Sequence, residues 1–133
     1  GAEEIVKLCH KKRLNMAMVT SSSTNSLNLK TANHKWIKLI QEKVKGDDPE
    51  LKNGKPSPDP YLLAAKRINT MAVNCWAVED SIAGSTSALK AGCKVWILDR
   101  DKKAYFEDKF ISYKGQYTII SNLYALNAIL KKY

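Results

Sequence analysis

Residues 75–98 have the sequence CWAVEDSIAGSTSALKAGCKVWIL, and this stretch decides the fold class that we predict. It contains two apolar segments, Cys75–Val78 and Lys94–Leu98, and continuous apolar runs are typical of parallel strands covered on both faces. Between them we predict a helix over Ser81–Ala91, ended by Gly92. A strand, a helix and a second strand in succession indicate a parallel α/β sheet.

The flanking sequence continues this alternation. We predict further helices over Ala2–Lys12, Thr31–Gln41, Asp59–Ile68 (with Asp59 as cap and Pro60 in first position) and Asn122–Leu130, and further strands over Asn15–Val19, Lys43–Lys45 and Tyr117–Ile120. We predict a loop over Arg100–Gln116. The chain is therefore expected to form one α/β domain, residues 1–133, in which a Rossmann-like parallel sheet carries helices on both faces.

The composition excludes several classes of protein. The 133 residues are 44% hydrophobic and 26% charged, which is ordinary for a folded domain. No apolar run approaches the ~20 residues that span a bilayer, and the first residues, which include Glu3 and Glu4, lack the basic-then-apolar order of a signal peptide. A cytoplasmic location without a membrane partner is therefore the default expectation. The net charge of +9 is spread along the chain, which argues against a nucleic-acid surface. Cys9, Cys75 and Cys93 are predicted to be buried free thiols.

Polar residues follow the first predicted strand, where ligands bind in open α/β sheets. The hydroxyl of Thr20, with the backbone N–H groups of Ser21 and Ser22, could hold an anion. Helix capping by the same hydroxyl groups is the alternative. Further along, Lys55 stands between Gly54 and Pro56, so its backbone is constrained and its charge could neutralise a phosphate. The alternative for Lys55 is an ordinary loop lysine.

Two carboxylates, Glu79 and Asp80, end the strand over Cys75–Val78. Adjacent carboxylates at a strand end suit Mg²⁺, which takes one or two protein carboxylates and keeps several waters. The alternative is an acidic helix cap, which would explain Asp80 but not Glu79. The acidic pattern Asp99-Arg100-Asp101 also follows a strand. We interpret it as a charged turn, because lysines follow where a phosphate-binding turn would need glycine.

Three of these polar segments carry a family resemblance: Thr20–Ser22, Gly54–Pro56 and Glu79–Asp80. In their order and spacing they resemble the haloacid dehalogenase (HAD)-like hydrolase superfamily of phosphatases and phosphomutases. The stretches most similar to its branch with pseudouridine-5'-phosphatase, glycerol-3-phosphatase and β-phosphoglucomutase are Lys30-Thr31, His34-Lys35, Gly46-Asp47-Asp48-Pro49-Glu50 and Gly54-Lys55-Pro56-Ser57-Pro58-Asp59. The resemblance implies a HAD-like core and a Mg²⁺-dependent phosphatase of a small phosphorylated metabolite. It implies that Thr20 and Lys55 bind and neutralise phosphate, with Ser21 and Ser22 beside them. Asp80 would bind the Mg²⁺, and Glu79 would reach it directly or through water.

Members of that family also carry an Asp-x-Asp-Gly-Thr segment on the first strand and a helical cap, and neither occurs in these 133 residues. The first Asp is the nucleophile that forms an aspartyl-phosphate, and the second acts as acid and base. The resemblance therefore implies a C-terminal core fragment that is inactive by itself. The alternative hypothesis is a non-catalytic or regulatory domain that binds phosphate through Thr20, Ser21 and Lys55.

The same missing segment affects the predicted sheet. In the family, the nucleophile strand lies between the strand that ends at Thr20 and the strand that ends at Glu79. Its absence exposes two strand edges, and unpaired edges attract other strands. We therefore expect either that the two flanking strands close together or that a second copy of the chain covers the gap.

Overall fold

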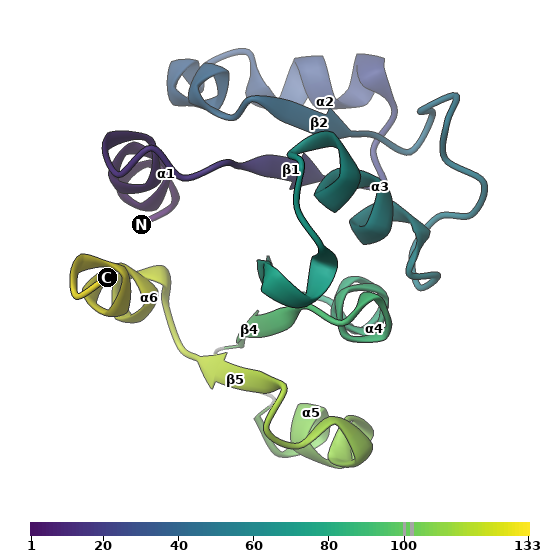
Figure 1. Ribbon diagram of the computed structural model, residues 1–133, viewed down its shortest axis with the longest axis vertical. Helices are drawn as coiled ribbons and strands as arrows, with labels where there is room; N and C mark the ends of the chain where they lie inside the picture. The colour runs from purple at the N-terminus through teal and green to yellow at the C-terminus, as the bar shows by residue number, and fades with distance from the viewer. Residues whose placement is uncertain (100, 102) are drawn as a thin grey trace.

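The computed structural model describes residues 1–99, 101 and 103–133, whose strands form two parallel sheets (Figure 1). The strands are β1 (Ala17–Val19), β2 (Glu42–Val44), β3 (Trp76–Glu79), β4 (Lys94–Leu98) and β5 (Tyr117–Ile120). One sheet has the order β1-β2 and the other the order β3-β4-β5, and every pair is parallel. The predicted α/β class is confirmed.

Helices connect and cover these strands. They are α1 (Ala2–Lys11), α2 (Thr24–Thr31), α3 (Asp59–Arg67), α4 (Ile82–Ala91), α5 (Lys103–Lys109) and α6 (Leu123–Lys131), with 3-10 turns η1 (Lys35–Leu39), η2 (Ala72–Asn74) and η3 (Ile111–Tyr113). Helix α3 contacts β1, β2 and α4, so it links the two sheets. Helices α1 and α6 pack side by side, which brings the two termini together (Figure 1).

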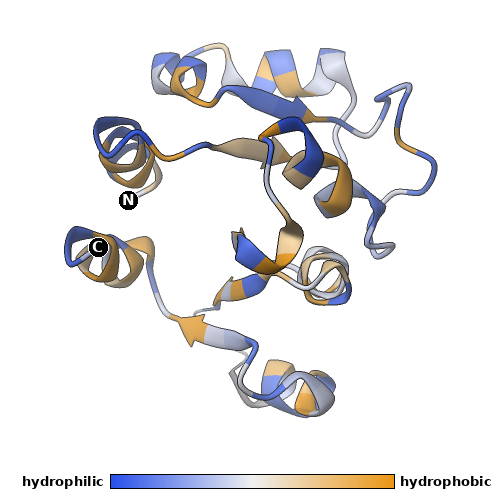
Figure 2. Ribbon diagram, in the orientation of Figure 1, coloured by the Kyte–Doolittle hydropathy of each residue, from blue (hydrophilic) through white to orange (hydrophobic). Residues whose placement is uncertain are grey.

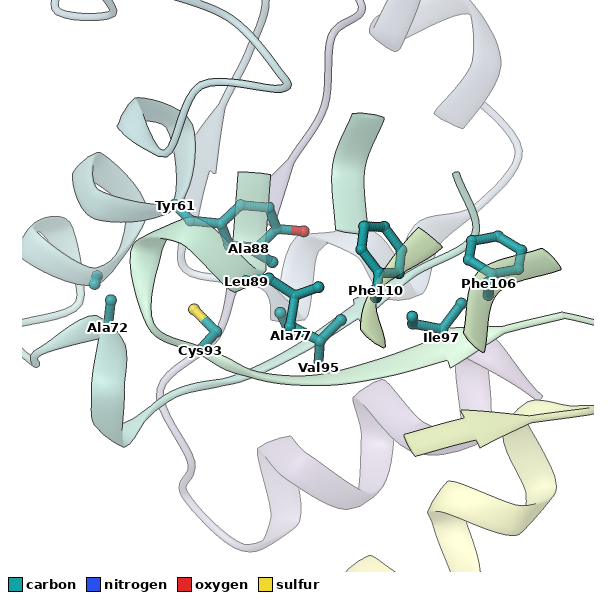
Figure 3. Close-up of a cluster of buried hydrophobic side chains, with 11 residues drawn as sticks. Tyr61, Ala72, Ala77, Ala88, Leu89, Cys93, Val95, Ile97, Phe106 and Phe110 are labelled. Carbon is teal, nitrogen blue, oxygen red and sulfur yellow. The ribbon is translucent and has the colours of Figure 1, made fainter. Parts of the chain in front are cut away.

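The β3-β4-β5 sheet is covered on both faces. Val95 and Ile97 of β4 lie in one buried cluster with Leu89 of α4, shown in Figure 3. Between them, Trp96 points the opposite way, into a second cluster with Leu126 of α6. Successive side chains of a strand alternate between faces, so a run without polar residues requires cover on each side. The prediction of helices on both faces is confirmed for this sheet.

The hydropathy of each segment matches its position in the fold. Helix α6 is largely apolar, whereas the long connection between β2 and α3 is mostly hydrophilic (Figure 2). None of the helices within the described residues is long and apolar enough to cross a membrane.

The three cysteines are free thiols, as predicted, but only Cys93 is buried and the other two are half-buried. Burial raises the pKa of the Cys93 thiol to about 12.

The helix predicted over Thr31–Gln41 is wrong. The chain forms α2 earlier, because the Ser23 side chain accepts a hydrogen bond from the Ser26 N–H and caps a helix that begins at Thr24. Helix α2 ends where the predicted helix was to begin, and η1 follows. Ile37 and Ile40, three residues apart, are both buried. Residues at this spacing share a face in a 3-10 turn as well as, approximately, in an α-helix, so the apolar spacing fits both.

The prediction of a loop over Arg100–Gln116 is wrong where α5 forms. Phe106 and Phe110 lie four residues apart, and both are buried against the core, which gives this segment a helical apolar face. Arg100 and Lys102, which belong to the charged turn predicted after β4, lie outside the described residues. In α3, Pro58 occupies the cap position, and the Asp59 carboxylate accepts a hydrogen bond from Asn53 at 3.1 Å instead of capping the helix.

Strands β1 and β3 do not close together, so that form of the edge prediction is wrong. They belong to separate sheets, and α3 packs against both β1 and α4, which holds the sheets apart. Val78, in the middle of β3, is 43% exposed. Cover of these edges by a second copy of the chain stays a prediction.

Candidate phosphate-binding site

Lys55 joins the carboxyl ends of two strands from different sheets. It lies in the connection between β2 and α3, and its Nζ donates to the Val19 carbonyl oxygen at 3.2 Å and to Glu79 Oε1 at 2.5 Å. Val19 is the last residue of β1, and Glu79 is the last residue of β3. The Lys55 side chain is only 12% exposed. The structure therefore places Lys55 in a defined, nearly buried position and not in a free loop.

The carboxylate of Glu79 is buried and accepts two hydrogen bonds at one oxygen. Besides Lys55, the hydroxyl of Tyr61 on α3 donates to Oε1 at 2.5 Å. A Cβ on Gly84 would overlap this carboxylate, so a glycine is required in the first turn of α4. A buried charge is tolerated only when it is paired and hydrogen-bonded, and both conditions hold here.

Tyr61 was missed by the sequence analysis. Burial, together with the charge of Glu79, raises the pKa of the Tyr61 phenol, so it stays protonated and acts as a donor. In the sequence, Tyr61 looks like one more apolar residue of a helical stripe. Its partner Glu79 is 18 residues away, so no local pattern connects the two.

The loop after β1 is held by internal hydrogen bonds. The Thr20 N–H donates to the Val44 carbonyl oxygen at 2.9 Å, and its Oγ1 accepts from the Ser22 N–H at 3.1 Å. The hydroxyl oxygen of Ser22 accepts from Lys30 Nζ at 3.0 Å. The Ser22 N–H, which we predicted as an anion donor, is therefore engaged by Thr20 in a local turn. Ser21 is exposed at the tip.

The segment after β2 packs directly on this loop. The Gly46 N–H donates to the Ser22 carbonyl oxygen at 2.9 Å, and a Cβ on Gly46 would overlap the Ser21 carbonyl oxygen. The Asp47 carboxylate accepts from the N–H and the hydroxyl of Thr24, each at 3.0 Å. These bonds, chiefly that from the Thr24 N–H, lower the pKa of Asp47. The acidic stretch that carried the family resemblance thus fixes the start of α2.

The next residue, Asp48, binds Arg67, the last residue of α3. Arg67 donates to both Asp48 oxygens, at 2.6 and 2.8 Å, to Glu50 at 3.0 Å and to the Lys43 carbonyl oxygen at 3.1 Å. These hydrogen bonds from Arg67 lower the pKa of Asp48 and raise that of the guanidinium. The connection that carries Lys55 is therefore anchored where it leaves β2.

Asp80 is exposed at the end of β3. The α4 cap is Ser81, whose hydroxyl oxygen accepts from the Gly84 N–H at 3.0 Å, so Asp80 is not the cap residue that the alternative interpretation required. Asp80 lines a cavity of about 340 Å³ together with Asp99 and Tyr105. This cavity lies at the carboxyl ends of β3 and β4, where open α/β sheets bind ligands.

The predicted magnesium ligands Glu79 and Asp80 stay a prediction. No three His, Cys, Asp or Glu side chains in the part of the chain that the structure describes are placed to hold a metal ion together. Asp80 offers one carboxylate, and Oε1 of Glu79 already accepts from Lys55 and Tyr61. Because Mg²⁺ takes one or two protein carboxylates and keeps several waters, waters would supply most of its other ligands at this position.

Known proteins of similar sequence include several phosphatases. The chain is 37% identical over 99 residues to "(DL)-glycerol-3-phosphatase 2" of Arabidopsis thaliana, covering 71% of this chain and 41% of that protein. It is 38% identical over 99 residues to "Probable pseudouridine-5'-phosphatase" of Drosophila melanogaster, covering 71% of this chain and 43% of that protein. The chain thus spans less than half the length of these curated relatives.

The fold has close counterparts among solved structures. A HAD family hydrolase from Deinococcus radiodurans R1, crystallised with bound phosphate and sodium, superposes with a TM-score of 0.79 at 22% identity. The superposition covers 98% of this chain and 58% of that one. The model of the family described as "Haloacid dehalogenase-like hydrolase" matches residues 1–98, which include Thr20, Lys55, Glu79 and Asp80. This chain therefore belongs to the haloacid dehalogenase-like hydrolase family.

Proposed function

We propose that residues 1–133 form one domain that supplies the phosphate-binding part of a Mg²⁺-dependent phosphatase. Its substrate would be a small phosphorylated metabolite, which is the class named by the relatives of similar sequence. The observation that carries the proposal is the position of Lys55, whose ammonium group is held at the ends of β1 and β3 by Val19 and Glu79. A lysine fixed at this edge is suited to neutralise a bound anion.

In this proposal, Lys55 and Thr20 bind the transferred phosphoryl group. The Thr20 hydroxyl oxygen accepts from Ser22, so its own hydrogen is left to donate to a phosphate oxygen. Ser21, exposed at the loop tip, adds a donor, and Ser22 acts by orienting Thr20. Preorganised donors of this kind stabilise the charge that develops on the phosphoryl oxygens.

We propose Mg²⁺ binding for the whole protein and not for residues 1–133 by themselves. Asp80 would supply one carboxylate ligand, and the ion would neutralise phosphate charge. For Glu79, the ion pair with Lys55 favours an indirect role, through water or through the lysine.

We propose further that this chain binds phosphate without cleaving phosphate esters by itself. The 133 residues contain no Asp-x-Asp-Gly-Thr segment, so no group is offered for formation of an aspartyl-phosphate. The test incubates the purified chain with p-nitrophenyl phosphate and Mg²⁺ and follows release of p-nitrophenol. We expect no release above the buffer control. Turnover that disappears in Asp80→Ala would contradict the proposal.

Phosphate binding is tested separately by isothermal titration calorimetry with inorganic phosphate. We expect saturable binding that falls at least about tenfold in Lys55→Gln, since a charge-assisted contact is worth about 1.5–3 kcal/mol. Lys52→Gln is a matched control, because Lys52 is an exposed lysine of the same connection. Equal affinity in the Lys55 and Lys52 variants would remove the main support for the site.

A further inference from the structure

Tyr61 places a hydrogen-bond donor where packing alone would be satisfied by a phenyl ring. Tyr61 is 9% exposed and lies in the buried cluster of hydrophobic residues shown in Figure 3. Burying a hydroxyl costs free energy unless a partner is found. Tyr61 finds that partner in Glu79 Oε1 at 2.5 Å, the oxygen that also accepts from Lys55.

The three groups form a compact unit. Lys55 Nζ lies 5.7 Å from the centroid of the Tyr61 ring, within the range of a cation–π contact. Tyr61 thus contacts Glu79 through its hydroxyl and faces the lysine with its ring. Its hydroxyl has two consequences for Lys55: it fixes the orientation of the carboxylate, and it withdraws part of the carboxylate charge that would otherwise hold the ammonium group.

We propose that Tyr61 is a positioning residue for the anion site: by donating to Glu79, it sets where the Lys55 ammonium group lies and how much of its charge is left for phosphate. The inference rests on the proposed function for the role of Lys55. The hydroxyl acts through Glu79 and does not touch the phosphate. Loss of this one hydrogen bond lets Glu79 turn and leaves its full charge on Lys55, and both changes weaken anion binding.

The first test needs no phosphate. In Tyr61→Phe, the ring stays and only the hydroxyl is lost. An ammonium group held by two acceptors exchanges its protons slowly, so Lys55 should give a ¹H–¹⁵N signal at low temperature, assigned by its loss in Lys55→Gln. We expect Tyr61→Phe to broaden or shift this signal. The control is Tyr113→Phe, a half-buried tyrosine that packs edge-on against Phe110.

The second test measures phosphate affinity by calorimetry in the same variants, well below their melting temperatures. We expect the affinity of Tyr61→Phe to fall about fivefold to tenfold, similar to the lower range for loss of an outer partner at metal sites, and Tyr113→Phe to match wild type. If wild type binds no phosphate, the proposed function fails, and the ammonium signal alone decides the positioning role. A Lys55 signal in Tyr61→Phe identical to that of Tyr113→Phe would overturn the inference.

Discussion

Helix α3 bears an ionic cluster at each end, and of the two only the second includes a carboxylate that is open to water. Near its start, Tyr61 binds Glu79, which pairs with Lys55, and the side chains of that pair are 6% and 12% exposed. At its end, Arg67 is 22% exposed, its bidentate partner Asp48 is 9% exposed, and its second partner Glu50 is 68% exposed. The first cluster joins the ends of β1 and β3, whereas the second anchors the connection that follows β2.

This difference indicates separate functions for the two clusters. A buried charge pair gains little net stability over an apolar pair, yet loss of one partner is costly because the other charge is left unpaired. Such a pair is consistent with a binding role for Lys55. The Arg67 cluster is open to water at Glu50, and the bidentate geometry of Arg67 on Asp48 suits a mechanical anchor. Substitutions should therefore distinguish the Glu79 cluster, which belongs to the candidate site, from the Arg67 cluster, which anchors the connection after β2.

The largest effect is expected for Glu79→Ala. This change leaves the Lys55 ammonium group and the Tyr61 hydroxyl without their common acceptor, and removal of one partner from a buried pair costs about 3–5 kcal/mol. Urea denaturation measures the free energy of unfolding. The matched variant Glu50→Ala removes an exposed carboxylate and should cost no more than about 0.5 kcal/mol. Similar losses in both variants would contradict the contrast between the clusters.

Gly84→Ala tests the same buried cluster from the side of α4. A Cβ at this position would overlap the Glu79 carboxylate, which is held in place by two donors and cannot move without losing them. Overpacking of this kind costs about 1–3 kcal/mol, measured by urea denaturation, and phosphate affinity should fall with it. The control is Gly54→Ala, because nothing lies within 4 Å of the new Cβ there. An equally stable Gly84→Ala protein would show that the carboxylate is not fixed.

Much of the fold could be predicted from local sequence. The strands β3 and β4 come from largely apolar segments, and α4 is bounded by Ser81 and by Gly92, whose φ of 99° suits glycine. The prediction over Thr31–Gln41 failed because the cap at Ser23 competes with an apolar pattern that fits two kinds of helix. Helix α5 was missed because only Phe106 and, directly after the helix, Phe110 mark the apolar face.

The candidate site could be predicted in part, because several of its polar residues lie where predicted strands end. Lys55 stood out through its glycine and proline neighbours, and the structure brings it to the end of β1. Its pairing with Glu79, 24 residues away, depends on how the two sheets pack, which no local pattern encodes. For the same reason, neither Tyr61 nor the contacts of Gly46 and Asp47 with the loop after β1 could be inferred.

Arg67→Lys should have a smaller effect than either change at the buried cluster. A lysine keeps the charge but cannot donate to both oxygens of Asp48 while also reaching the Lys43 carbonyl oxygen. We expect a loss of about 1 kcal/mol by urea denaturation, with phosphate affinity within about twofold of wild type. A larger loss of affinity than in Tyr61→Phe would show that the anchoring cluster, and not Tyr61, governs the anion site.

The smallest expected effect is the contribution of Asp48 to the pH dependence of stability. Hydrogen bonds from Arg67 hold the pKa of Asp48 below its unfolded value of about 3.9, so the folded state releases this proton more readily than the unfolded chain. The resulting stabilisation is present above the unfolded pKa and is lost as the pH falls through the folded pKa. Urea denaturation of wild type and Asp48→Asn across this acid range measures it. The difference between them should be less than about 1 kcal/mol near neutral pH and should shrink below pH ~4, because protonation removes in wild type what the substitution has already removed. A difference that stays constant down to the lowest pH would show that Asp48 anchors the connection through its shape and not through its charge.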